Sequence, residues 1–455
     1  MRKSKTIIAD TITPVAAYLR LKSKQSFILE SMGNQDQKSR YSIIALDPVH
    51  DFKAMGHEVT LDGKAYQSQD PLLDLQKLVV KTDKVIPGLP FQGGAIGYVG
   101  FDTLSLYEDF GPQPKDDLGM PDMHLFLYET FLVFDQAEQK VTIVADDVYS
   151  GRSDLDAVIA KIEKVLSQPV AAEHVAPKLS PIEPKSNLTL KQFEDMVHRA
   201  QDLINAGDMF QIVPSQRFSF DFEENPFDFY RELRRTNPSS YMYYLDFGPY
   251  QIIGASPESL VAVRENEVMT NPIAGTRKRS LDPVKDQEMV DELAHDEKEL
   301  AEHRMLVDLG RNDLGRIAEY GSVKVTRLLE IEKYRYVMHL VSEVRGQLKP
   351  GTAAIEALKA TLPAGTVSGA PKVRAIKRLY ELEPVKRGVY AGAIGYLSQD
   401  NQLDFAIAIR TMVVKDGKGY VQAGAGIVHD SIAKNEYQET KNKARALLAV
   451  GGGKA

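Results

Sequence analysis

The order of strand-like and helical segments is the feature that most constrains the fold of this chain. Short β-like runs with turn signals and amphipathic helical runs alternate irregularly along 455 residues. Strict βαβ alternation is missing, so we expect an α+β fold with antiparallel sheets covered by helices rather than a doubly wound parallel sheet. The expected helices are 71–81, 153–167, 189–208, 284–305 and 352–361, and the clearest strands are 58–63, 123–135, 140–147, 390–397, 404–414 and 419–425.

One internal echo bears on the architecture. GGAIGYVGFD at 93–102 and AGAIGYLSQD at 391–400 share the string GAIGY. Glycine within a strand permits close backbone approach, either to a neighbouring strand or to a ligand. The echo is either a chance match of common residues or the trace of a duplicated architecture with equivalent strands in two halves.

A connector divides the chain. Residues 168–187, QPVAAEHVAPKLSPIEPKSN, hold four prolines and no periodicity, which is typical of a linker or long loop. We therefore expect an N-terminal region at 1–167 and a second region at 188–450. The second region opens with a helix that Thr189 caps and that ends at Gly207.

Composition excludes several classes of function. The net charge is -7 and the sequence pI is about 5.8, so no basic surface indicates nucleic acid or an anionic membrane. The chain has no cysteine, which rules out a disulfide framework, a thiolate metal site and a cysteine nucleophile. The N-terminus lacks a continuous apolar stretch and no window approaches about 20 apolar residues. A cytoplasmic location is the expectation.

Two pairs of glutamates are candidate metal ligands. Glu299 and Glu302 lie three apart on a predicted helix and continue into an apolar stripe through Met305, Leu306 and Leu309. Glu436 and Glu439 repeat the spacing on a second predicted helix near the C-terminus. Oxygen ligands from two helices suit Mg²⁺, whereas the absence of HExxH and Glu-x-x-His pairs disfavours zinc or di-iron. A pair of solvated helix faces explains the spacing equally well.

Four further motifs have both a plain and a functional interpretation. QAGAGIVHDS at 422–431 is either a tight turn or a backbone cradle for an oxyanion. NPIAGTRKRS at 271–280 is either a turn with a solvated basic run or an anion-binding loop. His339 stands in an apolar run, where a satisfied core histidine is commoner than an acid or base. The loop of 362–384 enters a helix near Pro371, and helix N-termini bind anions.

These motifs occur together in one order. DEKELAEHRMLVDLGRNDLGRI, PAGTVSGAPK, LDFAIAIRT, GAGIVHDS and NEYQETKNKA resemble the chorismate-utilising enzymes, and most closely their anthranilate synthase component I branch. The resemblance is strong over about 190–450 and looser before it, through 28–48 and the first GAIGY segment. It implies two orthogonally packed antiparallel sheets in a sandwich with outer helices. It also implies an Mg²⁺-dependent lyase reaction in which chorismate and ammonia give anthranilate and pyruvate.

The resemblance assigns roles to the candidate residues. Glu302 and Glu439 match the principal Mg²⁺ ligands, with Glu299 and Glu436 as helpers, either directly or through water. Glu258 matches the acid that protonates the departing hydroxyl, and His339 the residue that assists pyruvate elimination, with Thr366 beside it. The matched substrate contacts are Gly275, Thr276, Tyr390, Arg410, Gly424, Ala425, Gly426 and Lys443, and Gln211 belongs to the same site.

Two positions choose among the branches. Relatives that add water to form isochorismate or salicylate commonly have a lysine where this chain has Gln211, and a neutral amide cannot act as that base. Aminodeoxychorismate synthases usually read PIKGT with a nucleophilic lysine, whereas this chain has Ala274 in PIAGT. Both differences favour anthranilate synthase, with aminodeoxychorismate synthase component I as the first alternative. An isochorismate or salicylate synthase, or a non-catalytic chorismate-binding relative, is the second.

The resemblance also implies a partner and an effector. Without cysteine the chain cannot hydrolyse glutamine through a thiolate, so ammonia comes from solution or from a separate glutamine amidotransferase subunit. Feedback inhibition by tryptophan in this family places Glu30, Ser31, Ser240, Tyr241 and Met242 in the effector pocket. Ser240 replaces a proline that is common in the family, which loosens a rigid turn.

Overall fold

The computed structural model describes residues 1–32, 40–169, 179–334 and 337–450. Within them the helices are α1 (Pro14–Leu21), α2 (Pro71–Leu78), α3 (Leu155–Leu166), α4 (Leu190–Asn205), α5 (Pro226–Thr236), α6 (Pro283–His295), α7 (Glu297–Gly315), α8 (Ala354–Thr361), α9 (Gly365–Ser368), α10 (Lys372–Leu382) and α11 (Ala433–Leu448), with a 3-10 helix at Phe101–Leu106. Among these described residues no helix has the length and apolar character to cross a membrane.

The first sheet has eleven strands in the order β1-β10-β9-β3-β2-β14-β15-β24-β25-β13-β11. Its members are β1 (Arg2–Ile8), β2 (Phe27–Glu30), β3 (Tyr41–Leu46), β9 (Thr130–Asp135), β10 (Lys140–Asp146), β11 (Lys185–Ser186), β13 (Ser215–Asp221), β14 (Tyr241–Asp246), β15 (Tyr250–Ser256), β24 (Thr411–Lys415) and β25 (Lys418–Gly424). Neighbouring strands pair antiparallel throughout, and the β2–β14 pairing joins the N-terminal strands to the C-terminal ones.

The second sheet has twelve strands in the order β18-β20-β17-β16-β23-β22-β7-β8-β4-β5-β6, with β19 also paired to β20. Its members are β4 (His50–Met55), β5 (Glu58–Leu61), β6 (Lys64–Gln67), β7 (Gly94–Val99), β8 (Met123–Tyr128), β16 (Ser259–Arg264), β17 (Glu267–Thr270), β18 (Ile273–Lys278), β19 (Lys324–Lys333), β20 (Val337–Gln347), β22 (Ala393–Ser398) and β23 (Leu403–Ile407). A separate two-stranded ribbon pairs β12 (Gln211–Ile212) with β21 (Gly369–Ala370).

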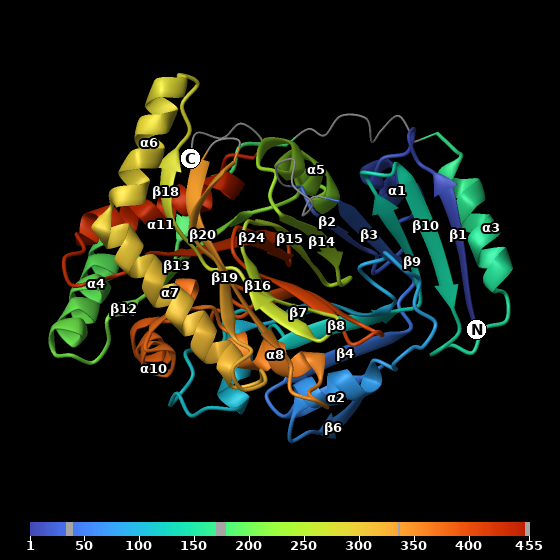
Figure 1. The fold of residues 1–455 in the computed structure, drawn as a ribbon, viewed down its shortest axis with the longest axis horizontal. Coiled ribbons are helices and arrows are strands. Elements are labelled where there is room, and N and C mark those ends of the chain that lie inside the picture. The colour runs from blue at the N-terminus through green and yellow to red at the C-terminus, as the bar shows by residue number, and fades with distance from the viewer. Residues whose placement is uncertain (33–39, 170–178, 335–336, 451–455) are drawn as a thin grey trace.

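Three large apolar cores, and a small fourth one around Leu293, Met338 and Leu340, hold these layers together within the described residues. Between the sheets, side chains of the two inner faces meet directly, as where the rings of Phe27 and Phe126 lie 5.4 Å apart. Helices α1, α3, α5 and α11 cover the outer face of the first sheet, and α2, α4, α7, α8 and α10 that of the second. Figure 1 shows α1 and α3 beside β1 and β10 at one end, and α4 and α11 at the other. The expected α+β sandwich of large antiparallel sheets with outer helices is confirmed.

The GAIGY echo lies at the centre of the second sheet. β7 and β22 are adjacent antiparallel strands, and Gly97 faces Gly395 in their register. A Cβ on Gly97 would come within 2.2 Å of the His124 carbonyl oxygen, and one on Gly395 within 2.0 Å of that of Asp404. The glycines therefore serve approach to neighbouring strands rather than to a ligand, because any side chain would collide with backbone.

Helix boundaries follow local capping. Thr189 caps α4 through a full capping box with Gln192, as expected. The helix predicted over 284–305 is wrong as one element, because Asp296 accepts hydrogen bonds from the amides of Lys298 and Glu299 and so starts α7 anew. The strand predicted over 404–414 is interrupted at Arg410, whose φ is +48°.

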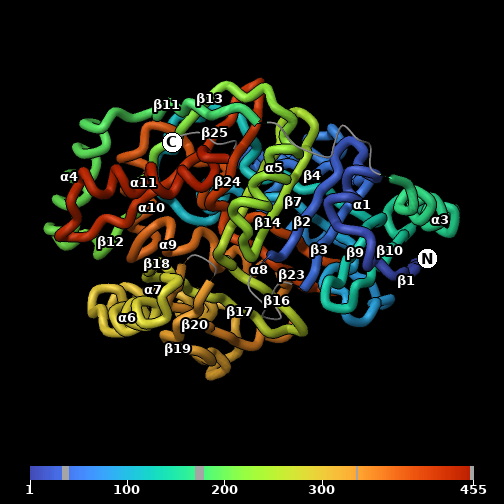
Figure 2. Tube along the Cα trace, turned by 90° about the horizontal axis from the view of Figure 1, so that it is seen from above, coloured from blue at the N-terminus to red at the C-terminus, as the bar shows by residue number. Residues whose placement is uncertain are grey.

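The connector expected at 168–187 lies partly outside the described residues. From 179 onward the chain packs against the molecule: Leu179 and Ile182 lie on the core beneath the first sheet, and Ser180 binds Glu224. Strands from both 1–167 and 188–450 contribute to both sheets. The tube in Figure 2 shows this mixing, with blue and red segments side by side.

Candidate active site

Helix α7 packs against strand β18 and carries the two predicted glutamates. Glu299 and Glu302 are half-buried, and the same face continues into buried Leu306. A Cβ on Gly275 would lie 3.2 Å from the Glu299 Oε2, so this carboxylate rests against the β18 backbone. Burial raises the pKa of Glu299, and the charge of Glu302 raises it further. The pair is therefore not a plain solvated face.

The basic run after Gly275 binds protein carboxylates. Arg277 forms ion pairs with Glu292 at 2.8 Å, Asp296 at 2.7 Å and Glu299 at 3.4 Å. Arg279 pairs with Asp286 at 2.7 Å. Both sequence interpretations of 271–280 are corrected: the segment is strand β18, and these arginines hold α6 and α7 rather than a free anion.

Gln211 holds Glu302 in place. Its Nε2 donates to the Glu302 Oε1 at 2.9 Å. A Cβ on Gly426 would lie 2.8 Å from that nitrogen, so a side chain there would displace the amide. The amide therefore lies between Glu302 and the loop of Gly424, Ala425 and Gly426, called the GAG loop below.

The second glutamate pair occupies the first turns of α11. Glu436 is half-buried, and burial followed by the charge of Glu439 raises its pKa. Glu439 is more exposed and pairs with Lys443 at 2.8 Å. Lys443 also donates to the Gly424 carbonyl at 3.0 Å. Lys298 of α7 pairs with Asp430 at 3.5 Å, which brings the start of α7 beside the start of α11.

The donor set has the chemistry of a hard-cation site. It consists of carboxylate oxygens, which Mg²⁺ prefers, and the pKa of one carboxyl in each pair is raised first by burial and then by its neighbour's charge. A divalent cation would relieve that repulsion. Among the described residues, no three or more His, Cys, Asp or Glu side chains are spaced to hold one ion. The residues fit Mg²⁺ by chemistry, and the structure presents them as two pairs on helices whose starts lie side by side.

His339 projects from β20 toward the bulge at Gly275. Its Nδ1 lies 3.1 Å from the Gly275 carbonyl oxygen and 3.0 Å from the Thr276 Oγ1. Because a carbonyl oxygen only accepts, Nδ1 carries the hydrogen in this bond and Nε2 keeps its lone pair. Burial lowers the pKa of His339, so the ring is neutral near pH 7. The hydroxyl beside it belongs to Thr276; Thr366 contacts Glu258 instead.

Glu258 is the most perturbed carboxyl of the site. It is 8% exposed, at the turn between β15 and β16, and its Oε1 accepts from the Thr366 Oγ1 at 3.1 Å. Burial raises its pKa to about 8, although the Thr366 hydrogen bond and the charges of Lys443 and Arg410 act the other way. A carboxyl that stays protonated at neutral pH can act as a general acid.

Tyr390, Arg410 and the GAG loop form the opposite wall. A Cβ on Gly424 would lie 2.9 Å from the Tyr390 hydroxyl. Burial raises the pKa of Tyr390 to about 12, so it remains a neutral donor. The predicted cradle of three amides is wrong for Ala425, whose N–H donates to the Pro214 carbonyl at 3.1 Å.

The five predicted effector residues gather where β2 meets β14. Met242 faces Glu30 in register, and Met32 donates to the Ser239 carbonyl just beyond Ser31 and Ser240. Their side chains divide between two faces. Glu30 accepts from Tyr230 and Arg234 of α5 at 2.5 and 2.8 Å, whereas the Tyr241 hydroxyl donates to Asp404 of the second sheet at 3.0 Å.

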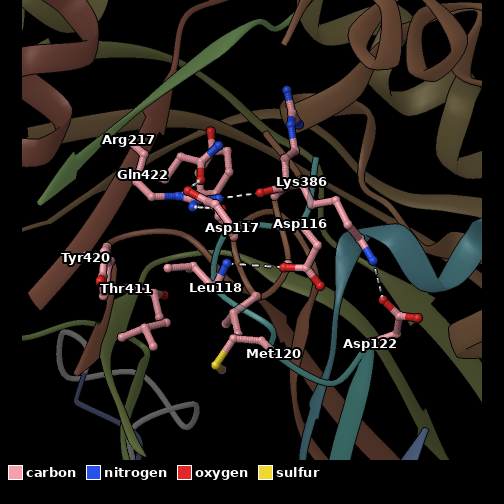
Figure 3. A pocket seen from close by; sticks show the side chains of 15 residues that line it. Asp116, Asp117, Leu118, Met120, Asp122, Arg217, Lys386, Thr411, Tyr420 and Gln422 are labelled. Atoms are coloured by element: carbon pink, nitrogen blue, oxygen red, sulfur yellow. Dashed lines mark hydrogen bonds and ion pairs between the residues drawn. The ribbon is translucent and has the colours of Figure 1, made fainter. Parts of the chain in front are cut away.

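Two cavities flank the site. One lies beside Glu258 and Thr366, walled by Leu306, Leu309 and Gly310 of α7. The other, in Figure 3, is lined by Tyr390 and by Asp116, Leu118 and Asp122 among others. Of the predicted site residues, only Tyr390 lines this second cavity.

Sequence reasoning missed the charged side chains beneath the site. Glu383 and Arg387 form a buried ion pair at 2.7 Å between segments that carry predicted residues. Lys372 and Asp313 form another at 2.6 Å, joining the start of α10 to α7. The signal was present in the sequence, because Arg387 stands immediately before the apolar run GVYAGAIGY.

Comparison with known proteins shows the family of this chain. The family model described as chorismate binding enzyme matches residues 24–449. The chain is 52% identical over 456 residues to "Anthranilate synthase component 1" of Lactococcus lactis subsp. lactis, with 99% of this chain and 100% of that protein covered. It is 43% identical to the protein of that name from Cereibacter sphaeroides, covering 97% of this chain and 92% of the relative.

Solved structures give the same result. The crystal structure of anthranilate synthase component I from Streptococcus pneumoniae TIGR4 superposes with a TM-score of 0.86 at 51% identity, covering 97% of this chain and 99% of that one. The menaquinone-specific isochorismate synthase of Escherichia coli superposes with a TM-score of 0.73 at 20% identity, covering 98% and 95%. The second similarity concerns the fold alone.

We predict that Glu258→Gln stabilises the chain increasingly as pH rises. Below about pH 4.5 the carboxyl is neutral in both states; above it the unfolded chain ionises while the folded one stays protonated up to about pH 8. The wild type therefore loses stability across that window, and the amide does not. The free energy of unfolding of the variant, relative to wild type, should rise by roughly 3–5 kcal/mol. Urea unfolding at pH 5 to 9 measures this.

Glu343→Gln is the matched control. Burial alone would raise the pKa of Glu343, but hydrogen bonds from Arg345 and Thr326 bring it to about 2. Its ionisation therefore ends below pH 5, and the stability difference from wild type should stay constant over the same range. A flat difference for Glu258→Gln would contradict the assignment of Glu258 as a buried neutral acid.

Proposed function

Since the chain belongs to the chorismate binding enzyme family, we propose that it is the component I of an anthranilate synthase, converting chorismate and ammonia to anthranilate and pyruvate. Relatives that match over nearly the whole chain bear that name. The reaction is that of a lyase: an amine adds at C2 as the C4 hydroxyl leaves, and pyruvate is then eliminated.

The hydrogen bond and the neutral side chain of Gln211 are the main support for this proposal. Its amide is committed to Glu302 at 2.9 Å, and it occupies the position where water-adding relatives have a lysine. A neutral amide cannot deprotonate water. Ala274, in β18, likewise removes the nucleophile expected of an aminodeoxychorismate synthase. Direct addition of ammonia remains the chemistry that these residues support.

Chorismate is a dicarboxylate, and the site offers matching donors. Arg410 points an uncommitted guanidinium at it: no hydrogen bond or ion pair of that group is present within the described parts of the chain. A planar fork of N–H groups suits a carboxylate. Tyr390 supplies a neutral hydroxyl and Lys443 a positive charge beside Gly424. Gly275 and Thr276 line the side nearest His339.

Two side chains handle protons. Protonated Glu258, aligned by Thr366, gives its proton to the departing C4 hydroxyl, which leaves as water. The Nε2 of His339 is free to take the C2 proton as pyruvate leaves and the ring becomes aromatic, because Nδ1 is bound to Gly275. Burial favours both protonation states, since it keeps the acid and the base neutral.

Glu302 and Glu439, with Glu299 and Glu436, would hold Mg²⁺. When bound, the ion supplies Lewis-acid polarisation and charge neutralisation to the ring carboxylate. In its absence these glutamates would repel an anionic substrate, so the metal and chorismate are expected to bind together.

Ammonia comes from a separate subunit in this proposal. The chain has no cysteine and cannot form a thiolate glutaminase. The printed name "component 1" of its relatives supports a partner component. We also propose inhibition by tryptophan at the β2–β14 strand ends, where Ser31 and Ser240 lie together.

The product assay tests the main proposal. The purified chain, mixed with chorismate, Mg²⁺ and ammonium, should form anthranilate and pyruvate in equal amounts. With glutamine in place of ammonium it should form neither, because the chain lacks a thiolate nucleophile. Aminodeoxychorismate or isochorismate as product would select another branch, and no consumption of chorismate would indicate a non-catalytic relative.

We expect Glu302→Gln and Glu439→Gln each to lower turnover at saturating chorismate by about 100-fold or more, since several kcal/mol of charge stabilisation would be lost. Titration of turnover with Mg²⁺ and calorimetry of Mg²⁺ with chorismate are the measurements. Glu297→Gln is the control, because Glu297 is exposed one turn away on the same helix. Full activity in either ligand variant would refute the metal assignment.

Tryptophan should inhibit the chain, and binding can be followed through the effector itself. The protein contains no tryptophan, so all indole fluorescence arises from added ligand. Its anisotropy should rise on addition of protein. Ser31→Leu should abolish the rise by filling the strand end, whereas Ser4→Leu, on exposed β1 of the same sheet, should not. Unchanged anisotropy with wild type would refute the effector site.

A further inference from the structure

A buried ion pair lies beneath the site. In the described part of the chain, its polar atoms form no hydrogen bond with the side chains assigned to substrate binding. Glu383, at the end of α10, and Arg387 have side chains only 4% and 2% exposed. The Arg387 Nε donates to the Glu383 Oε2 at 2.8 Å and its Nη2 to Oε1 at 2.7 Å. Such a bidentate pair has one strongly preferred geometry.

The arginine reaches two backbone segments of the site. Its Nη1 donates to the Val367 carbonyl at 2.7 Å, and its Nη2 to the Val213 carbonyl at 2.6 Å. Val367 directly follows Thr366, which aligns Glu258, and Val213 lies two residues from Gln211, which holds Glu302. The Arg387 guanidinium thus links the segment that positions Glu258 to the segment that positions Glu302.

The same pair reaches the carboxylate-binding wall. The Arg387 Cζ lies 5.5 Å from the centre of the Tyr390 ring. Glu383 Oε1 accepts from the Ser215 amide and hydroxyl at 2.8 and 2.7 Å, and Ser215 pairs with Gly424 in the β13–β25 register. Gly424 is the residue whose lack of a side chain leaves room for the Tyr390 hydroxyl.

We propose that the Glu383–Arg387 ion pair is the positioning element of the chorismate site, setting the loop of Thr366, the Gln211 segment and Tyr390 in one arrangement. This inference rests on the proposed function. Arg387 and Glu383 are positioning residues, since the substrate would meet only the groups that they place. Fully satisfied buried networks of this kind specify one geometry, and their disruption leaves an uncompensated charge.

Arg387→Lys is the primary test. Lysine keeps the charge beside Glu383 but has one nitrogen, which cannot hold two carbonyls and a carboxylate together. We expect KM for chorismate to rise by about tenfold or more, with KM for ammonia within about twofold of wild type, because the carboxylate wall is misplaced while ammonia needs no such grip. Glu383→Gln, which keeps the acceptor for Ser215, should shift KM for chorismate in the same direction by less.

Lys386→Met is the matched control. Lys386 precedes Arg387 and forms a comparably buried ion pair with Asp122 at 2.9 Å, shown by the dashed line in Figure 3. Its ammonium bonds to Asp122, and in the described part of the chain it forms no bond with a predicted substrate residue. This variant should lower the melting temperature, as loss of a buried pair does, and leave KM for chorismate within about twofold.

The outcomes separate cleanly. Unchanged KM for chorismate in folded Arg387→Lys, or in folded Glu383→Gln if the first does not fold, overturns the proposal; so does an equal rise of KM in Lys386→Met. KM is measured as chorismate consumption, so a wild type that makes another product refutes the proposed function while the comparison of variants still stands. A wild type that neither binds nor consumes chorismate overturns both.

Discussion

Both sheets are complete only when strands from the two ends of the chain pair, and the rest of the structure depends on that pairing. In the second sheet it requires Gly97 opposite Gly395, where any Cβ would strike a neighbouring backbone. In the first sheet β2 joins β14, and the inter-sheet core then closes over aromatic side chains from both regions. Core packing of this density fixes strand ends to fractions of an ångström, and the candidate site is built at those ends.

The site concentrates charge that would be costly to bury unpaired, and most of it is paired. Arg387 holds Glu383, Lys372 holds Asp313 and Arg277 holds Asp296, each at 2.6–2.7 Å. A buried ion pair contributes little net stability but restricts geometry strongly. These ion pairs lie between the strands and the loops of the candidate site. Restricted geometry is useful there, because side chains must be held close to the position in which they contact the substrate.

Local signals were predictable from sequence, whereas the partners of charged residues were not. Thr189 and Gln192 form a capping box, and the apolar continuation of Glu302 marks an inward helix face; both are periodic or short-range patterns. The basic run at Arg277 was misjudged because its partners lie on α6 and α7, and the Ala425 amide because Pro214 is distant in sequence. Long-range pairing leaves no periodic trace. The ion pair of Arg387 with Glu383 spans only four residues, but the bonds of Arg387 to the Val213 and Val367 carbonyls are long-range and could not be predicted.

Arg410 differs from these paired charges, because its guanidinium has no ion-pair partner among the described residues. Its backbone has a φ of +48°, an uncommon conformation for a non-glycine residue that breaks the strand between β23 and β24. The guanidinium lies close enough to Glu258 for their charges to interact, and it forms no hydrogen bond or ion pair within the described ranges. Because Glu258 stays protonated at neutral pH, it cannot neutralise the arginine. Within the described residues the guanidinium is thus left without a compensating charge, and a bound anion would stabilise it. A carboxylate-bearing substrate meets that requirement. Its carboxylate and the guanidinium together carry no net charge, so Arg410 would then no longer lower the pKa of Glu258.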